Sequence, residues 1–237
     1  MKILSVESAA LVASAAVCED DKLLCEIFVN TAKTHSQTLM PMIDSVLEQS
    51  ETSLSDIDLI AVSNGPGSFT GLRIGVSTVK GLAHAKNLPV VGISSLYSMA
   101  YNLPFCCHLI CPIMDARRNQ VYNAVYEWES DNLNELISPR ALGIDELLED
   151  LIQKNRKVVF IGDGVLPHKE HIINTLGDMA VFAPPSASLQ RASALAAPAR
   201  ILFNQQKTTT CYELSPVYLR KSQAEREAEE KEKGEIK

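Results

Sequence analysis

The sequence predicts an α/β protein of two lobes, each a mixed β-sheet flanked by helices. Three observations favour this class. Short apolar runs of strand length alternate with longer segments whose apolar residues recur at helical spacing. Hydrophobic residues make up 46% and charged residues 22% of the 237 residues, which is ordinary globular usage. A pattern of consecutive strands followed by alternating helices and strands occurs once clearly and a second time more weakly.

The first half of the chain begins with three apolar runs separated by polar breaks. Strands joined in sequence by short turns form an antiparallel meander. The period then changes, and the apolar residues of the next segment fall within one broad helical arc, with Pro41 near the start of that helix. The elements expected in this half are strands at 3–6, 11–17, 23–29, 57–62 and 88–93, helices at 36–49 and 69–86, and a helix starting near Ser94 or Ser95.

This order, β-β-β-α-β-α-β, gives a mixed sheet with helices packed on it. It is also the order of the ribonuclease-H-like half of the actin, sugar-kinase and heat-shock ATPase superfamily, so we expect an actin-like ATPase fold. A second copy with fewer helices between its strands is expected after residue 103. Its predicted elements are strands at 109–114, 121–128 and 158–161 and helices at 144–153 and 192–203.

These patterns predict three parts of the chain. An N-terminal ribonuclease-H-like lobe with interface helices spans 1–103, and a truncated C-terminal lobe spans 104–220. The remaining 221–237 is dense in Glu, Lys and Arg with almost no apolar residues, so we expect a charged, disordered tail.

Charge and hydropathy exclude several classes of function. A net charge of −7 argues against binding nucleic acid unaided, because phosphate contacts need clustered Lys and Arg. No apolar run reaches the roughly 20 residues needed to span a bilayer. Glu7 also comes too early for a signal peptide. We therefore expect a cytoplasmic protein without membrane contact.

Three cysteines and a histidine cluster at Cys106, Cys107, His108 and Cys111. Zinc sites usually combine two separated pairs of ligands, and no second pair follows here. The flanking apolar residues are typical of a buried strand, where free cysteine is common. We expect no metal site.

The most specific segment is glycine-rich and lies at 63–75. Following a strand and entering a helix, such a turn can bind a phosphate through its free backbone N–H groups. It lacks the Gly-Lys-Ser or Gly-Lys-Thr ending of a phosphate loop. The alternative role of these glycines is close packing of helices.

A helical wheel of 72–86 puts Arg73, Ser77, Lys80 and His84 on one narrow polar side. The apolar arc that remains is wider than one sheet face can cover, and the methionine-rich helix at 36–49 has a similarly wide arc. Monomers rarely expose large apolar patches. The patch is therefore covered by the second lobe, or by a like or related subunit in a four-helix bundle, which is the interpretation we prefer. The predicted interface residues are His35, Leu39, Met42, Ile43, Val46, Gly67, Phe69, Thr70, Gly71, Leu72, Arg73, Gly75, Val76, Val79 and Leu82.

Three motifs carry a family resemblance. The string Gly-Pro-Gly-Ser-Phe-Thr-Gly-Leu-Arg-Ile-Gly at 65–75, the His-Ser-Gln helix entry at 35–37 and the closing Pro-Val-Tyr-Leu-Arg at 216–220 resemble the bacterial TsaB (YeaZ) family over nearly all of 1–220. The resemblance implies a subunit of the complex that makes threonylcarbamoyladenosine on transfer RNA, at the adenosine next to the anticodon.

The resemblance also implies partners. The subunit would pair with a TsaD-like catalytic homologue, joined by a TsaE-like ATPase, and would meet transfer RNA only through the complex. A homodimer is expected when the chain is alone. ATP and metal are expected on the partner subunits, and no cofactor on this one.

Catalytic residues are not expected on this chain. The catalytic homologue holds a metal with two histidines one helical turn apart, whereas His35 is followed four residues later by Leu39. Glu7 and Ser8 stand where related ATPases carry Asp and hydroxyl residues. Gly162 and Gly164 form either an adenosine-facing turn or an ordinary tight turn. Glu7, Ser8, Gly162 and Gly164 are thus candidate nucleotide contacts, and a stand-alone ATPase or phosphotransferase of this fold is the alternative function.

Overall fold

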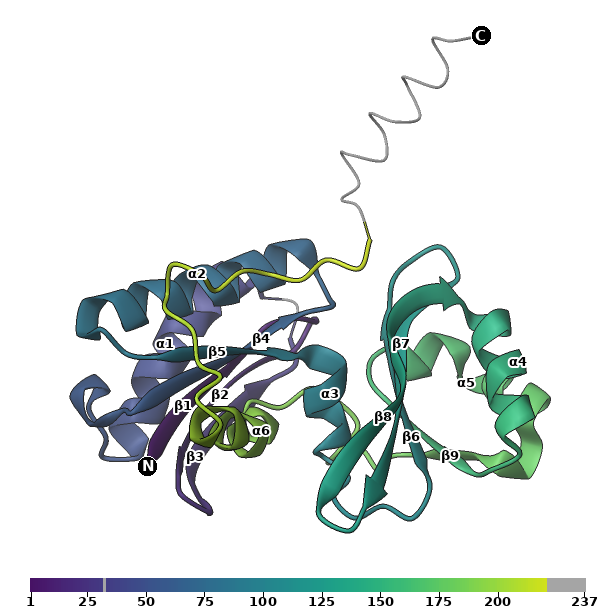
Figure 1. The fold of residues 1–237 in the computed structure, drawn as a ribbon. Coiled ribbons are helices and arrows are strands. Elements are labelled where there is room, and N and C mark those ends of the chain that lie inside the picture. Colours follow the sequence, from purple (N-terminus) through teal and green to yellow (C-terminus); the bar gives the residue numbers. More distant parts are fainter. Residues whose placement is uncertain (32, 221–237) are drawn as a thin grey trace, which may run out of the picture.

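The computed structural model describes residues 1–31 and 33–220, which form two lobes (Figure 1). The first lobe contains a five-stranded sheet in the order β3-β2-β1-β4-β5. Strand β1 is antiparallel to β2 and parallel to β4, so the meander and the parallel part of the sheet meet at β1. The strands are β1 (Lys2–Glu7), β2 (Ala13–Glu19), β3 (Lys22–Val29), β4 (Leu59–Gly65) and β5 (Val90–Ser94).

The second sheet repeats this topology, in the order β10-β9-β6-β7-β8. Strand β6 is antiparallel to β7 and parallel to β9, so it is the counterpart of β1. The predicted fold class, with two lobes of mixed sheets and helices, is confirmed. The strands are β6 (Leu109–Asp115), β7 (Gln120–Glu129), β8 (Asn132–Gly143), β9 (Val158–Ile161) and β10 (Ala180–Phe182).

The second lobe has as many strands as the first but shorter helices, so its truncation concerns the helices and not the sheet. Strand β8 was not predicted because polar and apolar residues do not alternate cleanly along it, and Pro139 interrupts it. Strand β10 was not predicted because it has only three residues. The lobe is shorter because its helices α4 and α5 have 11 and 12 residues, whereas α1 and α2 have 15 and 18.

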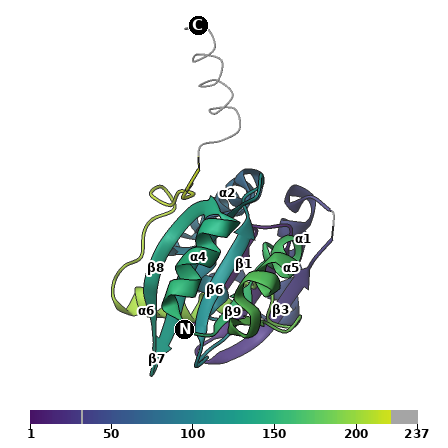
Figure 2. The same ribbon diagram turned by 90° about the vertical axis from the view of Figure 1, so that its right-hand side faces the viewer.

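Helices cover both sheets. The same face of the first sheet packs against α1 and α2, and the outer face of the second packs against α4 and α5, which lie in front in Figure 2. No helix of the described residues is long and apolar enough to cross a membrane. The helices are α1 (His35–Gln49), α2 (Phe69–Lys86), α3 (Ser95–Ala100), α4 (Ile144–Lys154), α5 (Val165–Leu176) and α6 (Ser193–Asn204), with short 3-10 turns at Leu54–Asp56 and Gly177–Met179.

The C-terminal part of the chain returns to the first lobe. Leu195 and Ala199 of α6 pack on the face of the first sheet opposite α1 and α2. Thr209 then pairs with Val90 of β5, and the Val217 amide donates to the Asn64 carbonyl at 2.7 Å. Helix α3 conversely packs against β6 and β7 of the second sheet. The assignment of 104–220 to one lobe is therefore corrected: order along the chain does not determine which sheet a helix covers. The predicted tail at 221–237 lies outside the described residues.

Candidate functional site

The glycines of the 65–75 string let the loop after β1 pack directly against the start of α2. A Cβ atom on Gly67 would lie 2.2 Å from the Ala9 carbonyl oxygen, and one on Gly71 would lie 2.2 Å from that of Ser8. On Gly75 it would lie 2.1 Å from Ser8 Oγ. These distances are far below van der Waals contact, so the three positions tolerate no side chain. The glycines thus serve close packing, but against a loop rather than a second helix.

The N-terminus of α2 is bound by groups of the protein itself. Ser68 is the N-cap, and its hydroxyl accepts from the Gly71 amide at 3.3 Å. The Ser68 amide donates to the Ala9 carbonyl at 2.7 Å. Two amides that a phosphate would use in this turn are therefore already hydrogen-bonded.

Glu7 and Ser8 both point into the protein. Glu7 is fully buried at the end of β1, and its Oε1 accepts from the Ala9 amide at 2.7 Å. Burial raises the pKa of this carboxyl to about 7. The Ser8 hydroxyl donates to the Gly71 carbonyl at 2.9 Å. Neither of these two candidate nucleotide contacts lines the cleft between the lobes.

The Gly162–Gly164 turn is packed against β6. Gly162 has φ +112°, and a Cβ atom there would lie 2.1 Å from the Ile113 carbonyl oxygen. The Gly164 amide donates to the same oxygen at 3.1 Å. The close packing of the turn against Ile113 explains why both positions are glycine. Asp163 between them lines the cleft, where burial raises the pKa of its carboxyl and Gln190 Nε2 donates to it at 3.3 Å.

The cleft has a volume of about 900 Å³. Its first-lobe wall is formed by the β1–β2 loop and the starts of α1 and α2, and its second-lobe wall by the end of β6 and the turn after it. His35 Nε2 lies 2.7 Å from the Ala10 carbonyl oxygen, within this wall. Among the described residues, no three His, Cys, Asp or Glu side chains are grouped so as to hold a metal ion.

Several cleft residues are not among the predicted site residues, including Asp115, Arg117 and Tyr122. Arg220, the last residue of the 216–220 motif, also lines the cleft. Asp115 ends β6, so it is the positional counterpart of Glu7 at the end of β1. Arg117 Nη1 lies 3.3 Å from Asp115 Oδ2. The internal repeat of the sequence is the signal that could have located Asp115. Using it requires recognising β8 and β10 and aligning the two lobes.

Nine of the fifteen predicted interface residues are buried in the first lobe. A helical wheel counts the sheet as the only neighbour, whereas α2 also packs against α1 and against the β1–β2 loop. The structure therefore does not present these side chains to a partner, which corrects the expected interface. The nine are Leu39, Met42, Ile43, Val46, Gly71, Leu72, Gly75, Val76 and Val79.

The exposed part of α2 is a narrower stripe. Ile74, Thr78, Gly81, Leu82 and Ala85 recur at helical spacing, and each is at least partly exposed. We call these five residues the α2 stripe. Apart from the adjoining residues and the backbone of α2 itself, no heavy atom of the described residues lies within 4 Å of the position of a Cβ on Gly81. Of the other predicted interface residues, Thr70 and Arg73 are exposed, and His35, Gly67 and Phe69 are partly so.

A C-terminal strap, residues 209–220, lies along the polar side of α2 (Figure 1). The Tyr218 ring stacks on that of Phe69, with centroids 4.2 Å apart and an interplanar angle of 5°. Arg73 Nε donates to the Tyr218 hydroxyl at 3.0 Å. Arg220 reaches across and donates to the Ala116 carbonyl of the second lobe. The three motifs at 35–37, 65–75 and 216–220 therefore meet around the start of α2.

Comparison with known proteins agrees with this arrangement. Residues 27–228 match the family model described as TsaD: tRNA N6-adenosine threonylcarbamoyltransferase. The chain is 32% identical to the tRNA threonylcarbamoyladenosine biosynthesis protein TsaB of Bacillus subtilis, covering 95% of this chain and 96% of the relative. The chain belongs to the TsaB (YeaZ) family. In this TsaB-family member, the motifs at 35–37, 65–75 and 216–220 lie where the β1–β2 loop, α2 and the strap pack together.

Solved structures support the same fold. A Pseudomonas aeruginosa protein described as similar to peptidase YEAZ superposes with a TM-score of 0.78 at 24% identity, covering 92% of this chain and 99% of that one. The ROK hexokinase of Thermus thermophilus superposes with a TM-score of 0.50 at 12% identity, covering 86% and 100%. The TsaB-family fold is thus the two-lobed fold shared with sugar kinases, as the order of elements predicts.

Proposed function

We propose that the chain acts in the biosynthesis of threonylcarbamoyladenosine on transfer RNA, as a non-catalytic subunit that pairs with and activates a TsaD-like catalytic homologue. Its TsaB relative is named for this pathway, and the matching family model is that of the transferase. A TsaE-like ATPase would join the pair, and transfer RNA would be bound by the complex. ATP and metal would belong to the partner subunits.

The α2 stripe is the observation that carries the pairing. Glycine in a helix interior destabilises the helix by about 1 kcal/mol relative to alanine. Gly67, Gly71 and Gly75 have an internal reason in the β1–β2 loop, but Gly81 has no neighbour within 4 Å in the described chain. A glycine flanked by half-buried Ile74, Thr78 and Leu82 is typical of a surface that another helix approaches closely.

The inward orientation of Glu7 and Ser8 supports the non-catalytic role. A catalytic carboxylate has to reach a metal ion or phosphate, and the Glu7 carboxylate instead binds the amide of Ala9 inside the protein. Ser8 Oγ is held by the Gly71 carbonyl, so it offers no free hydroxyl to a ligand in the cleft.

Gly81→Arg tests the pairing. A long cation in the middle of the stripe should weaken co-purification with the TsaD-like protein at least about tenfold, because it separates two helices that would otherwise be in contact. The stability of the helix itself should increase by up to about 1 kcal/mol, since arginine is a better helix former than glycine. Affinity is measured by titrating the labelled partner, and folding by urea denaturation.

Gln153→Arg provides the matched control, because Gln153 is an exposed position of α4 on the second lobe. It should leave the affinity unchanged. Wild-type affinity in Gly81→Arg would exclude the α2 stripe as the interface while leaving the family assignment intact.

The alternative function, a stand-alone ATPase or phosphotransferase, is favoured by the cleft. Its volume suits a nucleotide, and Lys33, Arg117 and Arg220 line it. This alternative predicts magnesium-dependent ATP turnover by the isolated chain, with loss of turnover in Glu7→Ala. Our proposal predicts no turnover above background by the isolated chain, measured as phosphate release. Turnover that disappears in Glu7→Ala would establish the alternative.

A further inference from the structure

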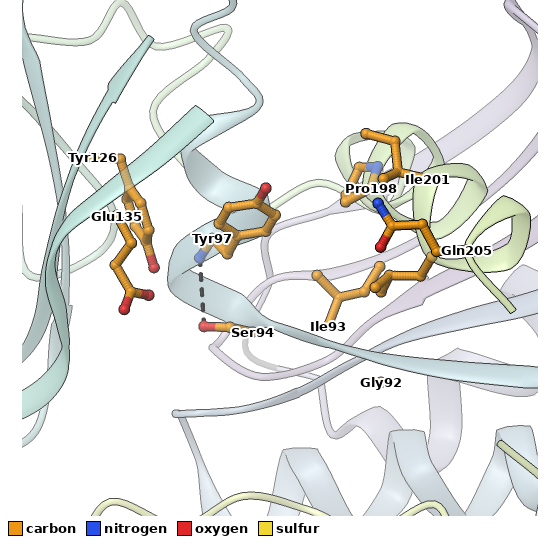
Figure 3. A pocket seen from close by; sticks show the side chains of 10 residues that line it. Gly92, Ile93, Ser94, Tyr97, Tyr126, Glu135, Pro198, Ile201 and Gln205 are labelled. Carbon is orange, nitrogen blue, oxygen red and sulfur yellow. Dashed lines mark hydrogen bonds between the residues drawn. The ribbon is translucent and has the colours of Figure 1, made fainter. Parts of the chain in front are cut away.

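A second cavity lies between the lobes, away from the cleft, and the two share no lining residue. It has a volume of about 360 Å³, within the range of small-molecule sites. One wall comes from β7 and β8 of the second lobe, the opposite wall from α6, and the floor from the end of β5 and the start of α3 (Figure 3).

The polar groups of this cavity are neutral or negative. Among the described residues that line it, Glu135 is the only charged one, and none is lysine, arginine or histidine. Glu135 and Tyr126 are register partners in β7 and β8, so their side chains project from the same side of the sheet, as Figure 3 shows. A ligand with a negative charge would therefore meet a carboxylate without a compensating cation.

Tyr126 supplies an unused hydrogen-bonding group. Tyr126 is fully buried. Its hydroxyl has no hydrogen-bond partner of good geometry among the described residues, although the Ser94 hydroxyl is close by. Buried polar atoms normally find a partner, and each exception calls for an explanation. A ligand donor would satisfy this oxygen once a small movement of the neighbouring side chains admits it, since the oxygen has almost no accessible surface.

Two aromatic rings complete the recognition. The rings of Tyr97 and Tyr126 are 5.5 Å apart and inclined at 70°, and both line the cavity. Aromatic faces attract cations through the ring quadrupole. Ile201 and Leu202 of α6 provide an apolar surface on the opposite wall.

We propose that this cavity binds a small organic ammonium ion. The ammonium head lies between Glu135, Tyr126 and Ser94, donating to their oxygens, and the hydrocarbon part lies against Ile201 and Leu202. An ammonium group has three donors and no acceptor, which matches a lining of oxygen atoms.

The test uses the full chain and n-butylammonium as the probe, with 1-butanol as its neutral analogue and butyrate as its anionic one. Binding is followed by protein-observed NMR titration. We expect saturable shifts at the cavity residues with butylammonium, and at least about tenfold weaker binding of butanol and butyrate, since these lose the charge interactions.

Variants locate the site. Glu135→Gln removes the charge, and Tyr126→Phe removes the hydroxyl without changing the packing; each should weaken butylammonium binding at least about fivefold. Glu149→Gln is the matched control, because Glu149 is an exposed carboxylate on the same lobe outside the cavity, and it should bind as the wild type does.

Three outcomes would overturn the proposal. Butanol binding as tightly as butylammonium would mean an apolar cavity without charge selection. An equal loss in Glu149→Gln and Glu135→Gln would mean general attraction to an acidic protein. Finally, the wild type is titrated to about ten times the butylammonium concentration that saturates a site with a millimolar Kd. If no saturable binding appears there, no ammonium site exists.

Discussion

The sequence locates Glu7 in the fold but does not predict the direction in which its carboxyl points. Its place at the end of the first strand follows from the apolar run before it. That its carboxyl turns inward to the Ala9 amide depends on the closeness of the β1–β2 loop to α2, which in turn depends on three glycines. The helical wheel of α2 likewise has the correct period, but it leaves Gly71 and Gly75 outside the arc that covers the sheet, because a wheel does not include the β1–β2 loop that buries them.

The buried carboxyl makes stability depend on pH. It ionises near pH 4.5 in the unfolded chain and near pH 7 in the folded protein. Between these values only the unfolded state has lost the proton, so the free energy of unfolding falls as pH rises through this window. Glu7→Gln, which keeps an oxygen acceptor, should raise the free energy of unfolding by about 2–3 kcal/mol at pH 8 and leave it nearly unchanged at pH 4.5. Urea denaturation at both pH values measures the difference, and a pH-independent effect would contradict it.

At the scale of elements, the C-terminal strap holds α2 on the side away from α1. The sequence marked 216–220 as a motif but gave no position for it, because the strap is irregular and has no period to read. Sequence reasoning also found β6, β7 and β9 while missing β8 and β10. A three-residue strand and an interrupted one carry too little pattern to distinguish them from loops.

The strap should be energetically coupled to α2 through the Phe69–Tyr218 stack. The double-mutant cycle of Phe69→Ala and Tyr218→Ala should give a coupling of about 0.5–1.5 kcal/mol, the range found for aromatic pairs. Urea denaturation of the four proteins measures it. A cycle of Phe69→Ala with Tyr212→Ala is the control and should be additive, because Tyr212 contacts His84 further along the helix. Additivity in both cycles would show that the stack contributes nothing.

At the scale of the whole molecule, the α2 stripe predicts self-association of the isolated chain. The family resemblance leads us to expect a homodimer, and a stripe that suits a related subunit also suits a second copy. Sedimentation velocity should show a concentration-dependent dimer in the wild type and a monomer in Gly81→Arg. A dimer that survives this substitution would have to use a different surface.

The fold as a whole was the most predictable level. The order of three strands followed by alternating helices and strands is enough to give the sheet topology of the first lobe, because few arrangements satisfy short connections and right-handed crossovers. The return of α6 to the first lobe was not predictable in this way. Its apolar face could have covered either sheet, and only the assembled lobes decide between them.

Helix α6 has a consequence for how the protein is made. One face of the first sheet, with Ile3, Leu59 and Val91, is covered by Leu195 and Ala199 of α6. Because α6 begins at Ser193 and β5 ends at Ser94, the completed sheet keeps an apolar face open while the whole segment between these two elements is synthesised. Although domains generally fold in the order of their synthesis, here the lobe that is made first is the one that is completed last.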